Sequence, residues 1–345
     1  MRLRPRIAAA ALAATVLTLG TACGGTGTAA SSGTDTVTVY SADGLSGWYQ
    51  SRFDAFTDRT GIAVNLVEAG SGEVVSRLEK EQSNPQADVV VTLPPFIQKA
   101  DAQGLLVPSG VDTSAVPAAE KDPAGRHVPV VGNYLSFIAN PAASPAPRTW
   151  DDLLSDRLEG KIQYSTPGQA GDGTAVLLLL QHLMGKDGAL DYLARLQANN
   201  VGPSSSTGKL QPKVSNGELL VANGDVQMNL TSIADDGSTF DLFFPAGADG
   251  TRTTVALPYV MGLAKGAPRS EQGRQLMEFL LSEESQKTVA DEARGVSVRE
   301  DVRAATSDSA PARALQGVQV WSPNWNDVLI ELDSDVAAYQ KATGS

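Results

Sequence analysis

The chain has 345 residues and a formal net charge of −12, with 42 % hydrophobic and 19 % charged residues. This length favours two lobes over a single core, and the acidity argues against nucleic-acid binding, which needs a basic surface. Cys23 is the single cysteine, so an intrachain disulfide and a zinc site of several thiolates are excluded. The two histidines, His127 and His182, form no HExxH motif, and we expect no metal site.

The first 22 residues have the pattern of an export signal. Three arginines precede an apolar run over 7–19, which is too short to span a bilayer. The run ends at Gly20–Ala22 and Cys23, an arrangement that resembles a bacterial lipobox, in which the cysteine becomes the lipidated first residue. An ordinary secretory signal is the alternative. Residues 23–35 are rich in Gly, Ser and Thr and predict a flexible tether. We therefore expect an extracytoplasmic protein anchored to the outer face of the cell membrane.

From residue 36 the hydrophobic pattern alternates between strands and helices. We expect strands at 36–40, 62–67 and 87–93, each followed by a helix. The third strand is continuously apolar, as in a parallel sheet that is covered on both faces. This βαβαβ order predicts a doubly wound α/β lobe.

A second α/β unit and a helical ending follow. The pattern predicts strands at 161–164, 226–230, 241–244 and, interrupted by Pro258, at 253–264, and helices at 173–184, 187–198, 271–281, 283–293 and 326–341.

These elements predict an α/β clamshell of two lobes, each a sheet flanked by helices. The chain is expected to cross between the lobes near 133–140 and to return near 256–262, which makes a hinge with a central cleft. The predicted organisation is a lipoprotein signal at 1–22, a tether at 23–35, lobe 1 at 36–132 plus 263–345, and lobe 2 with the hinge strands at 133–262.

Ligands of open α/β sheets bind beyond the carboxyl ends of the strands. Three segments expected there, 71–73, 165–174 and 203–209, combine glycine with hydroxyl residues at helix N-termini. Free N–H groups and the helix dipole favour an anion at such positions. Acids lie among the same segments, and one or two of them could receive an ammonium group. Helix capping and solvated charges are the alternative explanations.

The candidate ligand-binding residues are Ser41, Asp43, Ser71, Gly72, Thr92, Asp172, Gly173, Thr174, Ser205, Ser206, Thr207, Asp225 and Tyr259, and Cys23 is the candidate lipidation site. The sequence contains no GxSxG motif, no P-loop and no GxGxxG motif after the first strand. We therefore expect neither catalysis nor a cofactor.

Longer segments carry a resemblance to a known family. They include VTVYSADGLSGWYQSRFDAFTDRTGI, IQYSTPGQAGDGTAV, LQANNVGPSSSTGKL and WSPNWNDV, and they spread from about residue 36 to 340. They resemble the periplasmic binding component of 2-aminoethylphosphonate ABC transporters, within the type II solute-binding proteins. The resemblance implies a non-enzymatic clamshell that delivers its ligand to a permease–ATPase complex. Iron-binding relatives are expected to carry adjacent tyrosines where this chain has Gln227-Met228, so a ferric site is not expected.

The resulting hypothesis places the phosphonate between the lobes, on main-chain N–H groups and hydroxyls of 71–72, 172–174 and 205–207. The amine would face Asp43 or Asp225, with Tyr259 near the hinge, in a monomeric protein. The same clamshell for an organophosphate, a polyamine or thiamine is one alternative. A ligand-sensing module is another, and a secreted phosphonate hydrolase is the least favoured.

Overall fold

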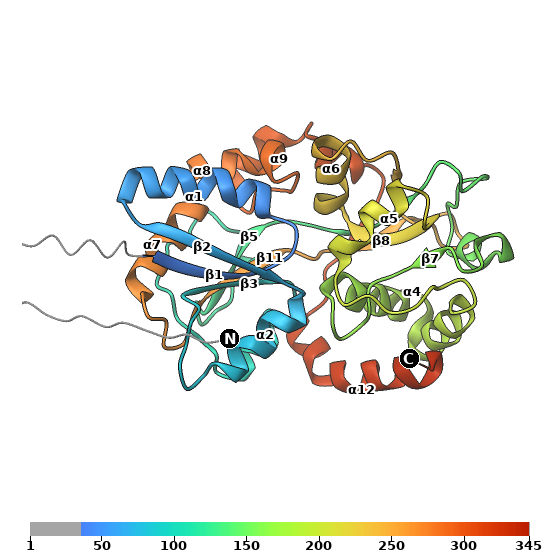
Figure 1. Ribbon diagram of the computed structural model, residues 1–345, viewed down its shortest axis with the longest axis horizontal. Helices are drawn as coiled ribbons and strands as arrows, with labels where there is room; N and C mark the ends of the chain where they lie inside the picture. Colours follow the sequence, from blue (N-terminus) through green and yellow to red (C-terminus); the bar gives the residue numbers. More distant parts are fainter. Residues whose placement is uncertain (1–35, 345) are drawn as a thin grey trace, which may run out of the picture. The chain divides into compact units, whose positions relative to one another are not determined.

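The computed structural model describes residues 36–344 (Figure 1). The predicted signal, the tether and Cys23 lie outside the described residues. Two sheets with their own helices make up the described chain, and we call them lobe 1 and lobe 2.

Lobe 1 contains the first sheet, in the order β2-β1-β3-β11-β4, with β5 also paired to β11. Strand β1 is parallel to β2 and β3, whereas β11 is antiparallel to β3. The strands are β1 (Thr36–Ala42), β2 (Ala63–Ala69), β3 (Val89–Thr92), β4 (Leu106–Val107), β5 (His127–Val131) and β11 (Tyr259–Ala264). The helices that follow the first three strands are α1 (Ser46–Thr60), α2 (Ser71–Lys80) and α3 (Phe96–Ala102). The predicted βαβαβ beginning is confirmed.

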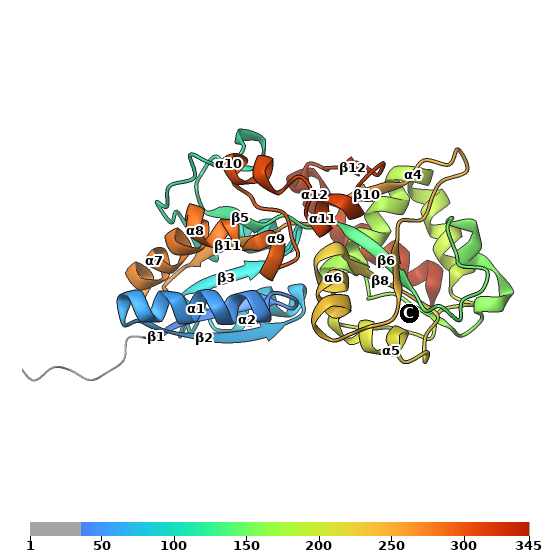
Figure 2. The same ribbon diagram turned by 90° about the horizontal axis from the view of Figure 1, so that it is seen from above.

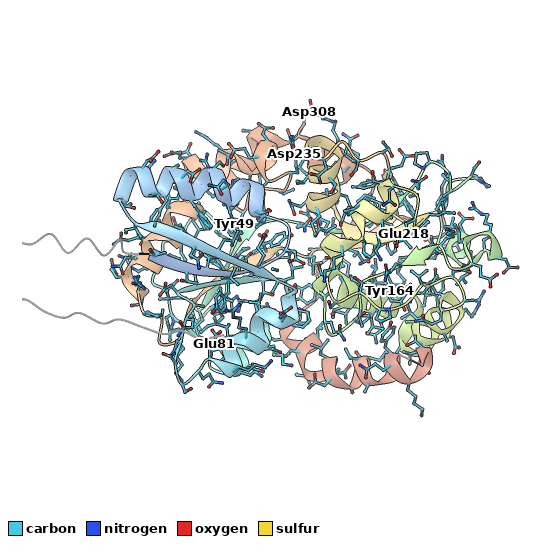
Figure 3. The ribbon with its side chains drawn as sticks, in the orientation of Figure 1. Tyr49, Glu81, Tyr164, Glu218, Asp235 and Asp308 are labelled. Atoms are coloured by element: carbon cyan, nitrogen blue, oxygen red, sulfur yellow. The ribbon has the colours of Figure 1, made fainter. Side chains whose placement is uncertain are left out.

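The packing of lobe 1 explains its hydrophobic pattern. All four residues of β3 are buried, because helices cover both faces of the sheet. Helix α1 turns Trp48, Tyr49, Phe53 and Phe56 toward the core, at spacings that place them on one side of the helix. Figure 3 shows Tyr49 between this helix and the sheet.

Lobe 2 contains a four-stranded sheet in the order β7-β8-β6-β9. Its strands are β6 (Leu135–Ala139), β7 (Ile162–Gln163), β8 (Val221–Asp225) and β9 (Asp241–Phe243), and its helices are α4 (Gly171–Leu196), α5 (Gln211–Ser215) and α6 (Val226–Asp235). Helix α4 is broken at Gly185, whose φ of 74° and ψ of 167° are not helical. This break agrees with the two helices predicted over 173–198.

One predicted strand of lobe 2 is wrong. Residues 226–230, expected to be extended, form the first turns of α6. The carboxylate of Asp225 accepts a hydrogen bond from the Met228 N–H at 2.7 Å and so begins a helix at that point. The strand lies one step earlier, as β8, and Asp225 is its last residue. Asp225 therefore stands where a strand ends and a helix begins.

Two short segments carry the chain between the sheets (Figure 2). The chain leaves β5 at 131 and enters β6 at 135, and it returns between β10 (Thr253–Val255) and β11. The single apolar strand predicted over 253–264 is thus two strands in different sheets, separated near Pro258. A proline there removes a ladder hydrogen bond and favours the interruption.

The C-terminal part returns toward lobe 2. Strand β12 (Gln319–Trp321) pairs in parallel with β10, and α12 (Trp325–Thr343) packs against α4. The hydroxyls of Tyr339 and Tyr164 lie 2.9 Å apart, and the ammonium of Lys186 lies 2.6 Å from the Asp335 carboxylate. The packing favours placing α12 with lobe 2, whereas the predicted boundaries put it in lobe 1.

Short elements fill the remaining connections. They are the helices α7 (Ser270–Leu281), α8 (Glu283–Lys287), α9 (Val289–Glu292), α10 (Glu300–Arg303) and α11 (Ala310–Ala314), and the 3-10 helices Ala118–Glu120, Asp151–Leu154, Asp156–Leu158, Thr207–Lys209 and Ala304–Thr306. Across residues 36–344, every helix falls short of the length or the hydropathy that a membrane span requires.

Candidate ligand-binding site

A small cavity lies where the first turns of α2 and α4 face each other. The starts of these helices are close, because a Cβ placed on Gly171 would lie 2.9 Å from the Ser71 hydroxyl oxygen. The cavity is lined by Ala42, Asp43, Gly70, Ser71, Leu93, Ala170, Gly171, Asp172, Ser206, Thr207 and Met228. These residues come from both lobes. The site predicted at strand ends and helix N-termini is therefore assembled between the two sheets.

The lobes are in direct contact around this cavity. The Ser206 hydroxyl donates to the Asp43 carboxylate at 2.5 Å, and the Gly72 N–H donates to the Gln169 carbonyl at 3.0 Å. The cavity has a volume of about 10 Å³, which is room for a single water molecule. A ligand of several heavy atoms must therefore separate the lobes and replace some of these contacts.

One half of the lining offers neutral hydrogen-bond donors. The first residues of α2 and α4 line the cavity, so the positive dipole ends of both helices lie beside it. The hydroxyls of Ser71, Ser206 and Thr207 lie beside them. In this closed arrangement Ser206 donates to Asp43 and Thr207 donates to Ser165 at 3.0 Å, so both hydroxyls must turn to serve a ligand. No lysine or arginine is found among the lining residues of the described chain. An anion would thus be held by backbone groups and hydroxyls rather than by a cation.

The other half of the lining is acidic, because Asp43 and Asp172 line the cavity. Asp225 does not line it, but Asp172 and Asp225 are both buried, with 2 % and 0 % exposure. Burial raises the pKa of Asp172 to about 6. Burial, and then the charge of Asp172, raise the pKa of Asp225 well above its ordinary value. Within residues 36–344, Asp172 Oδ1 and Asp225 Oδ2 are buried without a hydrogen-bond partner. Two acids in such surroundings favour a cationic group between them.

Tyr259 supports the acidic half from the end of β11. Its hydroxyl donates to the Asp43 carbonyl at 2.8 Å and lies 3.2 Å from Gln227 Oε1. Gly44 makes this approach possible, because its φ is +121° and a Cβ there would lie 2.2 Å from the Tyr259 hydroxyl oxygen. Burial raises the pKa of Tyr259 well above its ordinary value, so the phenol stays protonated and positions Asp43.

Residues 42–287 match the family described as bacterial extracellular solute-binding protein. The chain belongs to this family. A Salmonella typhimurium relative named "Putative 2-aminoethylphosphonate-binding periplasmic protein" is 51 % identical over 317 residues, which cover 90 % of this chain and 93 % of that protein. A Salmonella typhi relative of the same name is 50 % identical over 317 residues, which cover 90 % of this chain and 93 % of that protein.

Solved structures of the same fold are more distant in sequence. A periplasmic thiamin-binding protein has a TM-score of 0.76 at 18 % identity and covers 89 % of this chain and 96 % of its own. The apo ferric ion-binding protein A of Pasteurella haemolytica has a TM-score of 0.72 at 18 % identity, and the match covers 89 % of this chain and 98 % of that protein. The predicted fold, a type II periplasmic-binding-protein clamshell, is confirmed.

In this solute-binding protein, two predicted residues lie behind the cavity. The Ser41 hydroxyl donates to the Ala42 carbonyl at 2.8 Å and lies 3.2 Å from the Tyr49 hydroxyl. The Thr92 hydroxyl donates to the Ser71 carbonyl at 3.2 Å. Both side chains are fully buried and are used within lobe 1. They position the first turn of α2 and the end of β1 rather than line the cavity.

Two predicted residues of α4 also have internal roles. A Cβ on Gly173 would lie 2.0 Å from the Ser165 carbonyl oxygen, so this glycine permits close packing of the helix on that loop. The Thr174 hydroxyl donates to the Ala170 carbonyl and accepts from the Gly168 N–H, both at 2.9 Å. They shape the loop before α4.

Gly72 and Ser205 lie in an outer groove next to the cavity. They line a surface groove together with Glu73, Lys80 and Lys99. Because the Gly72 N–H already donates to lobe 2, it does not serve a ligand in this closed arrangement. Of the predicted residues, Asp43, Ser71, Asp172, Ser206 and Thr207 line the cavity directly.

Some lining residues were not predicted. Gly70 and Gly171 lie in the glycine-rich segments at the starts of α2 and α4, so the signal that predicts the neighbouring residues could have found them too. Met228 is not among the predicted residues because the hydrophobic pattern predicts a strand over its segment. Leu93 directly follows β3, and its apolar side chain carries no signal for a polar ligand.

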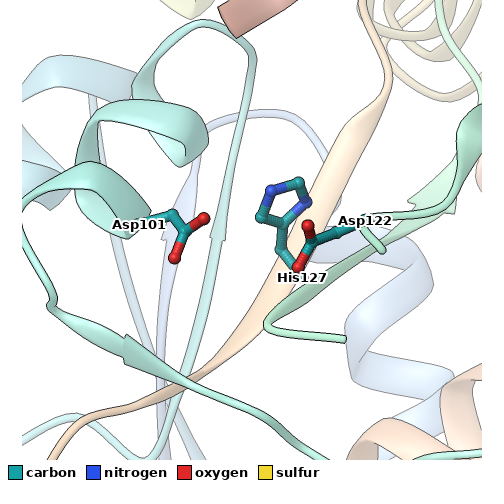
Figure 4. Close-up of side chains that lie close together, drawn as sticks. All are labelled: Asp101, Asp122 and His127. Carbon is teal, nitrogen blue, oxygen red and sulfur yellow. The ribbon is translucent and has the colours of Figure 1, made fainter. Parts of the chain in front are cut away.

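Asp101, Asp122 and His127 form a separate cluster in lobe 1 (Figure 4). Asp101 makes an ion pair with Arg126, and the Asp122 carboxylate accepts from the N–H groups of Ala124 and Arg126 at 3.2 and 2.7 Å. Burial lowers the pKa of His127. Both carboxylates thus have partners within the protein, and the cluster stabilises the turn before β5.

Proposed function

We propose that this protein captures 2-aminoethylphosphonate outside the membrane and delivers it to the permease and ATPase of an ABC importer. The observation that carries the proposal is the division of the cavity into two helix N-termini with hydroxyls and a group of buried acids. This arrangement suits a small ligand with an anionic and a cationic end. The names of the 50–51 % identical relatives support the same ligand.

In this proposal the phosphonate contacts the first turns of α2 and α4 and the hydroxyls of Ser71, Ser206 and Thr207. Such neutral donors stabilise an anion that is already balanced by its own ammonium group. The ammonium group contacts Asp43, Asp172 and Asp225. Binding replaces the direct bond between Ser206 and Asp43, and the two lobes then close on the ligand.

Inorganic phosphate, polyamines and ferric iron fit these surroundings less well. Inorganic phosphate would place an uncompensated anion next to buried carboxyl groups, which is costly. A polyamine would place cations at two helix N-termini, where the dipole is unfavourable. A ferric ion would need phenolate ligands, and the corresponding positions here are Gln227 and Met228.

The membrane attachment is part of the same proposal. Lipidation at Cys23 would hold the monomeric protein by a tether at the outer face of the membrane, close to the permease. A single cysteine that follows a signal-like segment supports this assignment.

Isothermal titration of the purified protein tests the ligand. We expect 2-aminoethylphosphonate to bind at least about tenfold more tightly than ethylphosphonate, ethanolamine or phosphate, because each of these lacks one half of the ligand. Equal binding of ethylphosphonate would contradict a role for the acids. Binding of none of the four would refute the proposed ligand.

A further inference from the structure

The two most deeply buried acids of the site, Asp172 and Asp225, come from different elements. Asp172 lies in the first turn of α4, and Asp225 ends β8 and caps α6. Both residues are almost fully buried, and each carboxyl group influences the pKa of the other. Each also has one buried oxygen without a partner in the described chain. Two buried carboxylates that influence each other in this way repel each other unless a proton or a cation compensates one of the charges.

The groups around this pair offer no compensating cation. Asp43 faces Asp172 from the end of β1, and its charge raises the pKa of Asp172 further. Thr207 lowers the pKa of Asp172 and Asn133 lowers that of Asp225, but both are neutral groups, and the Thr207 hydroxyl donates to Ser165 at 3.0 Å. Tyr259 faces both acids from β11. Two further groups interact with these: Tyr49 raises the pKa of Tyr259, and Glu68 interacts with Asp43. Neither is a cation.

We infer that the Asp172–Asp225 pair holds a proton in the ligand-free protein and exchanges it for the ammonium group of the ligand. The inference rests on the proposed function and extends it to the residues that select for an amine. On binding, a carboxyl O–H bond breaks and its proton passes to solvent. The N–H groups of the ammonium then donate hydrogen bonds to both carboxylates. Either the proton or the ammonium group compensates one of the two negative charges, and a ligand without a cation cannot take the place of the proton.

This exchange makes affinity depend on pH in a definite direction. Where the free pair is protonated, each binding event releases up to one proton, so the dissociation constant falls by up to about tenfold per pH unit as pH rises. Above the pKa of the free pair, the pair has already lost its proton and the dependence ends. For Asp172 this limit is about pH 6, and the pKa of Asp225 is raised as well.

Calorimetric titration of the full protein with 2-aminoethylphosphonate, in two buffers of different ionisation enthalpy, measures the protons released. The ligand's own phosphonate also titrates, so the informative quantity is the difference between wild type and Asp172→Asn. An asparagine keeps the shape of the side chain but cannot share the proton. Asp225→Asn is the second variant, because asparagine still accepts the Met228 N–H and preserves the cap of α6.

We expect wild type to release more protons than either variant, and each variant to bind about tenfold to about a hundredfold more weakly. Identical proton release in wild type and both variants, with tight binding of the ligand, would overturn the proton exchange while leaving the proposed function intact. Failure of wild type to bind the ligand at all would refute the proposed function instead. Either result is distinguishable from misfolding by the circular dichroism of the variants.

Discussion

Burying Asp172 beside Asp225 destabilises the ligand-free protein. The pKa of Asp172 is about 6 in the folded protein, above its ordinary value of 3.8. The folded state therefore holds the proton more tightly than the unfolded state. Stability falls as pH rises between these two values, and the penalty is fully present above about pH 6.

Asp172→Asn should therefore stabilise the ligand-free protein at neutral pH. We expect a gain of about 1–3 kcal/mol in the free energy of unfolding at about pH 7, and little gain at about pH 4 where the pair is protonated. Urea denaturation at both pH values measures this. Asp335→Asn is a matched control, because Asp335 is also buried but pairs with Lys186, and its loss should destabilise. A loss of stability in Asp172→Asn at neutral pH would contradict the repulsion argument.

Ser206 and Thr207 test the anion half of the site. Replacing both with alanine should weaken 2-aminoethylphosphonate binding by at least about tenfold, since two donors to the phosphonate are lost. Ser205→Ala is the control, because Ser205 lines the outer groove and not the cavity. Titration calorimetry of the three proteins gives the comparison. An unchanged dissociation constant in the double variant would remove this loop from the site.

At the scale of elements, the sequence predicted lobe 1 better than lobe 2. Its buried strands and amphipathic α1 have clear periods, whereas residues 226–230 have an apolar pattern that suits either a strand or a helix. The capping bond from Met228 to Asp225 decided for the helix, and that bond depends on the position of Asp225 in the folded sheet.

Only some of the predicted site residues line the cavity, and the reason again is tertiary structure. Glycine and hydroxyl residues mark helix N-termini in a sequence, and this signal found Ser71, Asp172, Ser206 and Thr207. It cannot tell a residue that faces the cavity from one that braces its loop, such as Thr174 or Thr92. That distinction depends on tertiary packing.

Gly70 permits the close contact of α2 with lobe 2. A Cβ at this position would lie 2.7 Å from the Ser205 carbonyl oxygen across the lobe boundary, although the backbone conformation itself suits alanine. We expect Gly70→Ala to hinder closure and to weaken ligand binding by about tenfold with little loss of stability. Titration and thermal unfolding measure the two effects. Gly47→Ala in α1 is the control, because nothing lies within 4 Å of its Cβ. Equal affinities in both variants would contradict this role.

At the scale of the whole molecule, the proposed lipid anchor can be tested separately from ligand binding. Cys23→Ser should release the protein from the membrane, because serine cannot carry the thioether-linked lipid, and it should leave ligand affinity unchanged. Fractionation of cells into membrane and medium measures the first effect, and titration of the released protein the second. A Cys23→Ser protein that stays with the membrane would contradict the lipid anchor.

In the proposed site, the phosphonate is shared between α2 of lobe 1 and α4 of lobe 2, and this arrangement has a consequence for unloading. Together the two helix N-termini act as a chelate, in which the second contact forms at high effective concentration once the first exists. When the lobes part, each helix retains a single weak contact with the phosphonate. On the phosphonate side, discharge into a permease therefore requires only that the lobes separate, while the acid pair takes back its proton from solvent. Any partner that holds the lobes apart converts a tight binder into a weak one.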